Sequence, residues 1–219
     1  MPVGATITGT SASSGGNPAG FASRADAAEF RTLDVSRDGD SYEVKALIYL
    51  AAPPQAVFAV LTDYEHFTRI SGSIVESRRI QQLNAADALV YTDTRFCALF
   101  FCRHVKEMQK VTQVAPGDIS STVLPEKSDN VKSGSAVLHL EAEGEGTLLH
   151  WQIRLQPGFW VPPLIGPLLV ERSLKAEGHR SAAGVEKLAR ERAHLPPLED
   201  SEDHAASEDK TQPGHGGDR

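Results

Sequence analysis

The chain has 219 residues, with 22 basic and 29 acidic side chains and a formal net charge of −7 at pH 7. A chain with this net negative charge gives no sign of the basic surface that nucleic-acid-binding proteins need, so we expect no nucleic acid among the partners. A transmembrane helix is also excluded, because no apolar run reaches the ~18 residues that one requires.

Composition divides the chain into three parts. Residues 1–29 are rich in Gly, Ser, Ala and Thr without apolar periodicity, and residues 195–219 contain seven acidic and two basic side chains. Such segments bury too little apolar surface to offset the loss of chain entropy on folding. We therefore predict a disordered N-terminal extension, one folded domain over 30–194 and a disordered acidic tail.

The first predicted elements of the domain are a strand over 40–50 and two short helices over 54–62 and 64–70. Apolar residues alternate with more polar ones over 44–50, which is typical of a strand with one face in the core. Pro53-Pro54 ends this strand, because proline donates no ladder hydrogen bond and fits the first turn of a helix.

The helical segment resembles a known family. Residues 52–64 follow the pattern A-x-P-x-x-V-(W/F)-x-V-(L/I)-x-D-Y, which resembles the opening of START-like helix-grip proteins of the SRPBCC superfamily, especially the bacterial polyketide cyclase/dehydrase and coenzyme Q-binding branch. Residues 159–167, Phe-Trp-Val-Pro-Pro-Leu-Ile-Gly-Pro, resemble the segment that opens the last helix in many members. The resemblance implies an α+β helix-grip fold, in which a curved antiparallel sheet wraps a long C-terminal helix and holds a hydrophobic ligand against it.

Six further strands and one long helix follow. Short loops rich in Gly, Pro, Asn and Asp separate most of the strands, which favours an antiparallel meander. The predicted strands cover 73–82, 88–97, 100–113, 117–124, 134–142 and 147–156, and the helix covers 162–192.

The last two strands carry a pattern that predicts their register. A two-residue loop at Gly144-Glu145, with glycine first as in a type II′ turn, gives both strands a shared apolar face. This register pairs Leu140 with Leu149, Leu138 with Trp151, Ala136 with Ile153 and, on the other face, His139 with His150. Two imidazoles without a third ligand make a weak metal site, so we favour a solvated cross-strand pair.

One face of the predicted C-terminal helix is directed at the sheet. Its residues recur every three or four positions, as in an amphipathic helix: Val170, Leu174, Gly178, Ser181, Val185 and Leu188. Gly178 and Ser181 are small where the pattern asks for bulk. Either they leave room for a ligand, or they let the helix approach a strand closely.

Candidate ligand-binding residues come from several of these elements. Arg95 and Arg103 lie among apolar residues; turned inward, they would anchor an anionic or carbonyl end of a ligand, and the favoured alternative is a surface arginine with a buried stem. For the aromatic residues, the alternative is core packing. The full set is Tyr64, Phe67, Arg95, Arg103, Trp151, Ile153, Trp160, Leu174 and Gly178.

Cys97 and Cys102 lie at the end of a predicted hairpin. A disulfide there requires opposed Cβ atoms, and we favour two buried free thiols in a reducing compartment. The start of the chain lacks the apolar stretch of a secretory signal. The compartment therefore stays open between the cytoplasm, as the sequence is written, and the periplasm, if the true start lies upstream.

The turn of that hairpin, from Phe96 to Phe101, contains no Gly, Pro, Asn or Asp. A solvated turn made of apolar residues is unusual. Either the C-terminal helix covers it, which we favour, or it makes a peripheral membrane contact together with the segment from Phe159 to Leu169.

The sequence contains no nucleotide-binding loop, metalloprotease motif or nucleophile elbow, and we predict no catalytic residue, metal or cofactor. The leading hypothesis is a carrier or chaperone that binds a lipid or polyprenyl quinone between sheet and helix; an apolar cavity would favour it. One alternative is a polyketide cyclase or aromatase-like enzyme, which needs an ionisable group facing the cavity. Another is a protein-interaction module, which needs no cavity.

Overall fold

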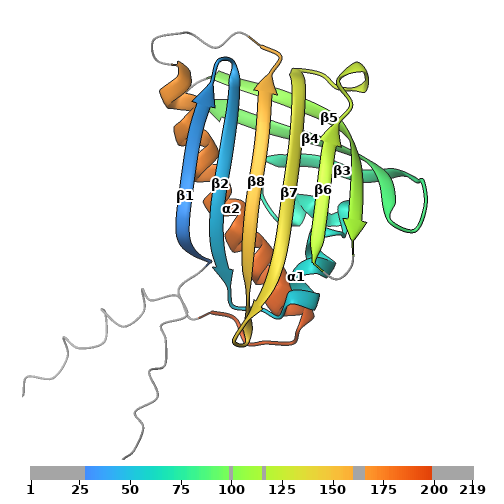
Figure 1. Ribbon diagram of the computed structural model, residues 1–219, viewed down its shortest axis with the longest axis vertical. Helices are drawn as coiled ribbons and strands as arrows, with labels where there is room; N and C mark the ends of the chain where they lie inside the picture. The colour runs from blue at the N-terminus through green and yellow to red at the C-terminus, as the bar shows by residue number, and fades with distance from the viewer. Residues whose placement is uncertain (1–27, 99–100, 115–116, 160–165, 199–219) are drawn as a thin grey trace, which may run out of the picture.

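The computed structural model describes residues 28–98, 101–114, 117–159 and 166–198 (Figure 1). The elements follow the predicted order, with an additional strand at the beginning and an additional short 3-10 helix at 125–127. In chain order they are β1 (Glu29–Asp38), β2 (Ser41–Leu50), α1 (Pro54–Leu61), the 3-10 helix η1 (Tyr64–Arg69), β3 (Ile74–Gln82), β4 (Asp87–Ala98), β5 (Phe101–Val114), β6 (Asp118–Val123), the 3-10 helix η2 (Pro125–Lys127), β7 (Val131–Glu143), β8 (Gly146–Pro157) and α2 (Gly166–Arg192).

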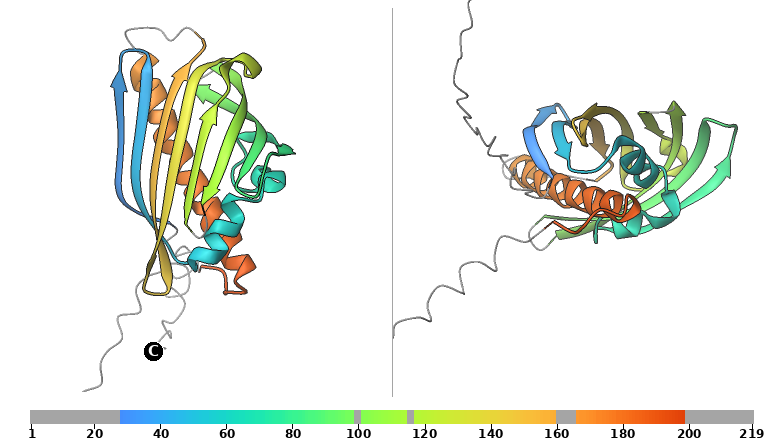
Figure 2. Two further views of the ribbon diagram at one scale, coloured as in Figure 1. Left: turned by 45° about the vertical axis from the view of Figure 1, so that its right-hand side comes forward. Right: turned by 90° about the horizontal axis from the view of Figure 1, so that it is seen from below.

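The strands form one antiparallel sheet in the order β1-β2-β8-β7-β6-β5-β4-β3. Register irregularities interrupt β1, β3 and β7, and such bulges bend a strand and increase its twist. The sheet accordingly curves around α2, as the two views of Figure 2 show. These features confirm the predicted α+β helix-grip fold.

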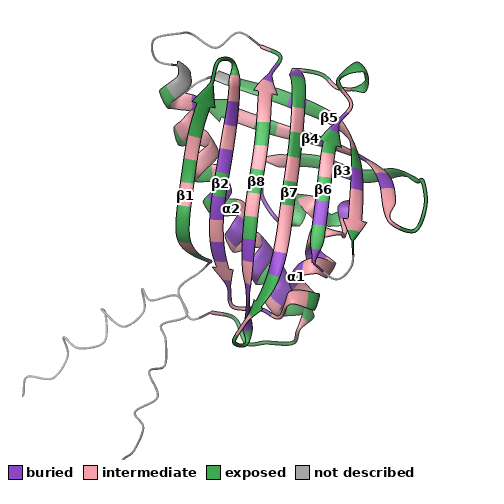
Figure 3. Ribbon diagram, viewed as in Figure 1, coloured by how far each residue is buried: buried purple, intermediate pink, exposed green. Residues whose placement is uncertain are grey.

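Strand β1 is absent from the sequence prediction, which places the first strand at 40–50. Leu33 and Val35 alternate as a strand requires, but the register shifts between Phe30 and Thr32 and breaks the apolar pattern. The turn to β2 contains Gly39 at φ +59°. β1 lies at the edge of the sheet and is mostly exposed, whereas buried residues alternate along β2 (Figure 3).

The β7–β8 hairpin confirms the predicted register, including Leu138 opposite Trp151 and His139 opposite His150. Gly144 has φ +59°, whereas Glu145 is not among the described residues with positive φ. A positive φ at the first loop position alone fits the expected type II′ turn.

The β4–β5 hairpin corrects the prediction for the cysteines. Cys97 lies directly opposite Cys102, and the two form a disulfide rather than two free thiols. Residues opposite each other in an antiparallel ladder bring their Cβ atoms into range of an S–S bond. The predicted strands, 88–97 and 100–113, place the loop one residue too early in the chain. With that loop, Cys97 would not lie opposite Cys102.

Helix α2 turns the predicted face toward the sheet, with Val170, Gly178, Val185 and Leu188 buried. The closest backbone approach, however, lies at Gly184 and involves a loop rather than a strand. A Cβ atom there would lie 1.9 Å from the carbonyl oxygen of Ile70.

A buried carboxyl group fixes the C-terminal half of α2. Glu186 is 1% exposed, and its two oxygens accept hydrogen bonds from the backbone N–H groups of Ala28 and Ala51, each at 2.6 Å. Arg190 donates a hydrogen bond to the carbonyl oxygen of Ala51. These contacts hold one wall of the interior against the start of β1 and the end of β2.

Candidate functional site: a cavity between the sheet and helix α2

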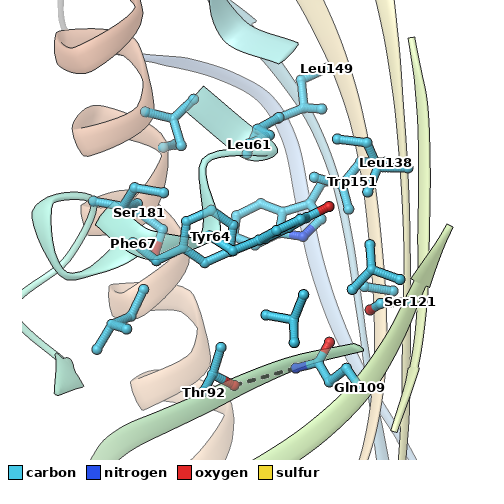
Figure 4. Close-up of a pocket in the computed structure, with 18 residues that line it drawn as sticks. Leu61, Tyr64, Phe67, Thr92, Gln109, Ser121, Leu138, Leu149, Trp151 and Ser181 are labelled. Carbon is cyan, nitrogen blue, oxygen red and sulfur yellow. Dashed lines mark hydrogen bonds between the residues drawn. The ribbon is translucent and has the colours of Figure 1, made fainter. Parts of the chain in front are cut away.

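A cavity of about 210 Å³ lies between the sheet, the α1–η1 segment and α2 (Figure 4). Most of its lining side chains are aliphatic or aromatic. They are Leu61, Tyr64, Phe67, Ile70, Ile74, Val90, Thr92, Gln109, Val111, Ile119, Ser121, Ala136, Leu138, Leu149, Trp151, Ser181, Ala182 and Val185.

The cavity lies between two separate clusters of buried apolar residues. One buried cluster joins β2, β8, α1 and α2, and a second joins Tyr64 to buried residues of β4, β5 and β6. Leu61, Phe67 and Leu138 pack against both clusters and also line the cavity. The curvature of the sheet thus leaves a space that the side chains do not fill.

Tyr64 and Phe67 form one wall, with ring centroids 5.4 Å apart in an edge-to-face arrangement. Tyr64 is fixed at both ends: its hydroxyl accepts a hydrogen bond from Gln113, and its carbonyl oxygen accepts one from Ser77 at 2.6 Å. Burial raises the pKa of the Tyr64 hydroxyl further above its ordinary value of 10. A short helix tied in this way presents its aromatic rings rigidly to the cavity.

The polar lining residues lie mainly on β4, β5 and β6. Figure 4 shows Thr92 and Gln109 on one side of the cavity and Leu61 and Leu149 on the other. The amide nitrogen of Gln109 donates to the Thr92 hydroxyl at 3.5 Å, close to the limit for a hydrogen bond. It also donates to Glu107 at 2.9 Å.

Glu107 lies two residues before Gln109 on β5 and therefore shares its inward face. Burial raises the pKa of this carboxyl group to about 7, although the hydrogen bond from Gln109 acts in the opposite direction. Close to neutral pH, the group is therefore divided between its protonated and ionised forms.

The structure brings three of the residues predicted from sequence, Tyr64, Phe67 and Trp151, to the cavity. Ile153, Leu174 and Gly178 are not among its lining residues. A Cβ atom on Gly178 would have only Trp151 within reach, at 4.0 Å, so this glycine adjoins the indole ring that lines the cavity.

Arg95 and Arg103 are both exposed and do not line the cavity, which agrees with the surface alternative. Trp160 lies outside the described residues. The same holds for parts of the two segments considered for membrane contact, Phe96 to Phe101 and Phe159 to Leu169. Among the helices that the structure describes, none combines the length and the apolar character needed to cross a bilayer.

Sequence reasoning missed the polar residues Thr92, Gln109 and Ser121. A signal was available for Ser121, which lies between the inward apolar residues Ile119 and Val123. It was not available for Gln109, which follows Glu107, or for Thr92, which precedes Thr94 on the same face. A polar residue at such a position is either satisfied within the fold or directed at a ligand.

The histidine pair on the outer face of the sheet belongs to an ionic network. His139 donates to Asp118 at 2.5 Å and to Glu141 at 3.0 Å, and these hydrogen bonds raise the pKa of His139. His150 lies 3.8 Å from Glu141. No group of three or more His, Cys, Asp or Glu residues suited to a metal ion occurs in the described part of the chain.

Comparisons with known proteins agree with this geometry. The family model described as "Polyketide cyclase / dehydrase and lipid transport" matches residues 41–191. No curated protein matches the sequence.

Several solved structures share the fold. The Zhui aromatase/cyclase from Streptomyces has a TM-score of 0.59 and 14% identity, covering 70% of this chain and 96% of that chain. A START superfamily protein from Mycobacterium smegmatis has a TM-score of 0.55 and 14% identity, and the match covers 68% of this chain and 97% of that chain. A STAR-related lipid transfer protein from Xanthomonas axonopodis has a TM-score of 0.51 and 16% identity, and the match covers 74% of this chain and 99% of that chain. At such identities the likeness concerns the fold alone.

Proposed function

Because the chain belongs to the family of polyketide cyclases, dehydrases and lipid-transport proteins, we propose that it binds an apolar small molecule between the sheet and α2, as a carrier or chaperone. The observation that carries this proposal is the cavity of about 210 Å³ with its mainly aliphatic and aromatic lining. An apolar molecule gains free energy on entering such a site because its surface leaves water. A lipid or a polyprenyl quinone is the ligand class expected from the sequence.

The size of the cavity limits the part of the ligand that it encloses. At about 210 Å³ it is smaller than the roughly 300–1,000 Å³ of typical small-molecule pockets. It therefore accommodates a compact ring system or a short chain segment in the described conformation. A long polyprenyl tail requires α2 to move away from the sheet or the tail to extend out of the cavity.

A pair of substitutions on neighbouring residues of β7 tests the proposal. Ala136 lines the cavity, whereas Val137 is 51% exposed on the opposite face of the strand. Ala136→Phe fills the cavity and Val137→Phe adds the same ring outside. The uncharged probe N-phenyl-1-naphthylamine should bind the wild type and Val137→Phe alike, and Ala136→Phe about tenfold or more weakly.

Thermal melts of both variants accompany this titration, because an added ring in a core costs about 1–3 kcal/mol of stability. If a folded Ala136→Phe protein binds the probe as tightly as the wild type, the cavity is not the binding site and the proposal fails.

A polyketide cyclase or aromatase-like enzyme is the second candidate, and Glu107 is the observation that favours it. A carboxyl group with a pKa of about 7 beside the cavity is suited to general acid–base catalysis at neutral pH. Such an enzyme should accelerate hydrogen–deuterium exchange at the methyl group of 2-acetylnaphthalene, measured by NMR, and Glu107→Gln should abolish the acceleration. If the exchange is no faster than in buffer alone, this result would count against an enzyme, and the carrier function would remain as the proposal. A ligand-free interaction module would not need the cavity, which weighs against that third hypothesis.

A further inference from the structure

The polar side chains of the cavity restrict which apolar molecule it accepts. We propose that the ligand is an uncharged phenol or alcohol on a compact apolar skeleton, that Gln109 and Thr92 bind its hydroxyl group, and that Glu107 orients the Gln109 amide. This inference rests on the proposed function, since it specifies the ligand of the same cavity.

The absence of charge from the lining is the first reason. None of the 18 described residues that line the cavity is Asp, Glu, His, Lys or Arg. Placing a carboxylate, phosphate or ammonium group inside would remove that group from water without an opposite charge, which is strongly unfavourable. The portion of the ligand that enters is therefore uncharged.

The second reason is the arrangement of donors and acceptors at Gln109. Its amide nitrogen donates to Glu107 at 2.9 Å and to Thr92 at 3.5 Å. Its amide oxygen has no hydrogen-bond partner among the described residues, and neither does the Ser121 hydroxyl. The Thr92 hydroxyl accepts from Gln109 and keeps its own proton to donate. The site thus presents an acceptor on Gln109 and a donor on Thr92, with the Ser121 hydroxyl as a further polar group on the lining.

A hydroxyl group matches this arrangement because it both donates and accepts a hydrogen bond. A ketone, an ether or the carbonyl group of an oxidised quinone only accepts, and would leave the amide oxygen of Gln109 without a partner. Within the proposed ligand class, a lipid alcohol or the reduced, phenolic form of a quinone therefore fits the site, and the oxidised quinone does not. A site built to bind a hydroxyl group discriminates against an analogue that lacks it, because its buried polar groups then stay unpaired.

The position of Glu107 is the third reason. On one side it adjoins Gln109; on the other it adjoins Val105, part of an apolar cluster with Val123 and Val131. The side-chain amide of Gln109 is its hydrogen-bond partner within the described chain. A carboxyl group beside an apolar cluster, with one amide as its partner, is costly for the fold, so it requires another explanation. When ionised, it accepts only, which holds the nitrogen of the Gln109 amide toward itself and the oxygen away.

Isothermal titration calorimetry with three probes of similar shape tests the proposal. The probes are 1-naphthol, 1-methylnaphthalene and 1-naphthoate, which place a hydroxyl, a methyl or a carboxylate on the same rings. The proteins are the wild type, Gln109→Leu, Glu107→Gln and the outer-face control Val137→Phe. The two interior substitutions preserve side-chain size, and the ratio of affinities for 1-naphthol and 1-methylnaphthalene removes any general effect on folding.

We expect the wild type and Val137→Phe to prefer 1-naphthol and to bind 1-naphthoate at least tenfold more weakly. Gln109→Leu should reduce the preference for 1-naphthol over 1-methylnaphthalene about tenfold, since one buried hydrogen bond is lost. Glu107→Gln should reduce this preference severalfold. A glutamine at position 107 can donate as well as accept, so the Gln109 amide can rotate and exchange the positions of its oxygen and nitrogen.

If the ratio of affinities is unchanged in Gln109→Leu, the proposal about the hydroxyl group is wrong. The proposed function still stands in that case, because the probes still bind. An unchanged ratio in Glu107→Gln overturns the orienting role of Glu107. Binding of 1-naphthoate as tight as that of 1-naphthol overturns the selection for uncharged ligands. If neither these probes nor N-phenyl-1-naphthylamine bind the wild type, the proposed function fails together with the inference.

Discussion

At the scale of single residues, two carboxyl groups face the interior with different partners. Glu186 accepts hydrogen bonds from two backbone N–H groups, so its partners are fixed parts of the fold. Glu107 has the mobile amide of Gln109 as its partner and a raised pKa. The first arrangement stabilises the protein and the second opposes folding once the group ionises.

Glu107 makes stability depend on pH in a defined direction. Its pKa rises from an ordinary value of 4.5 to about 7, so between these values the folded state binds more protons than the unfolded state. The contribution of this group to stability is therefore complete below pH ~4.5 and declines as pH rises to ~7, by about 3 kcal/mol at most. Urea unfolding of Glu107→Gln should lack this decline and show higher stability than the wild type at pH 8. Parallel pH profiles of the two proteins would contradict the burial of the charge.

Glu186→Gln should destabilise the protein by about 2–4 kcal/mol, because an amide can accept with one oxygen and turns a donor toward a backbone N–H group. Glu191→Gln, five residues further on, removes only an exposed ion pair with Arg69 and should change stability by less than ~1 kcal/mol. Urea unfolding at pH 7 compares them. Equal losses in both variants would argue against the anchoring role of Glu186.

At the scale of elements, α2 shows how small residues serve different purposes. Gly184 allows the carbonyl oxygen of Ile70 to approach the helix, whereas Gly178 has space around it and lies beside Trp151. The sequence identified Gly178 because it interrupts the apolar face. It did not identify Gly184, because the contact there involves a loop whose position only the tertiary fold defines.

The two glycines make opposite predictions for alanine. Gly178→Ala should stabilise the protein by up to about 1 kcal/mol through helix propensity, since the new methyl group meets only Trp151 at 4.0 Å. Gly184→Ala should destabilise it by about 2 kcal/mol or more, because the methyl group would overlap a backbone carbonyl. Thermal unfolding measures both. Stabilisation of the same size in both variants would contradict the close approach at Gly184.

The β4–β5 hairpin illustrates what sequence patterns leave undetermined at this scale. The β7–β8 register follows from its Gly144 turn and its two-sided pattern, whereas the β4–β5 turn carries no such signal. An error of one residue in the turn separates Cys97 from Cys102. Strand β1 was missed for a related reason, since its bulge disrupts the alternation.

Reduction of the disulfide should lower stability. Closing a loop of only a few residues constrains the unfolded chain modestly, so we expect a loss of about 2 kcal/mol from the Cys97–Cys102 bond. Urea midpoints with and without dithiothreitol measure it, and a Cys97→Ser/Cys102→Ser variant, insensitive to the reductant, is the control. A wild-type midpoint that dithiothreitol leaves unchanged would show that the bond contributes nothing.

At the scale of the whole molecule, the cavity results from the curvature of the sheet and the placement of α2. The curved sheet, the terminal helix and the aromatic residues of η1 were foreseen from the sequence and from its resemblance to helix-grip proteins. The polar lining was not, because Thr92, Gln109 and Ser121 lie on three strands whose inward faces meet only in the assembled sheet. Local sequence patterns thus predict the fold that encloses the cavity better than they predict the polar groups that line it.

Native mass spectrometry tests most directly whether the cavity holds a ligand. Wild-type protein mixed with 1-naphthol should give a second charge-state series, heavier by the mass of one probe molecule, and Ala136→Phe under the same conditions should give the ligand-free series alone. A wild-type spectrum without the heavier series, or an equally intense one from a folded Ala136→Phe protein, would contradict the account.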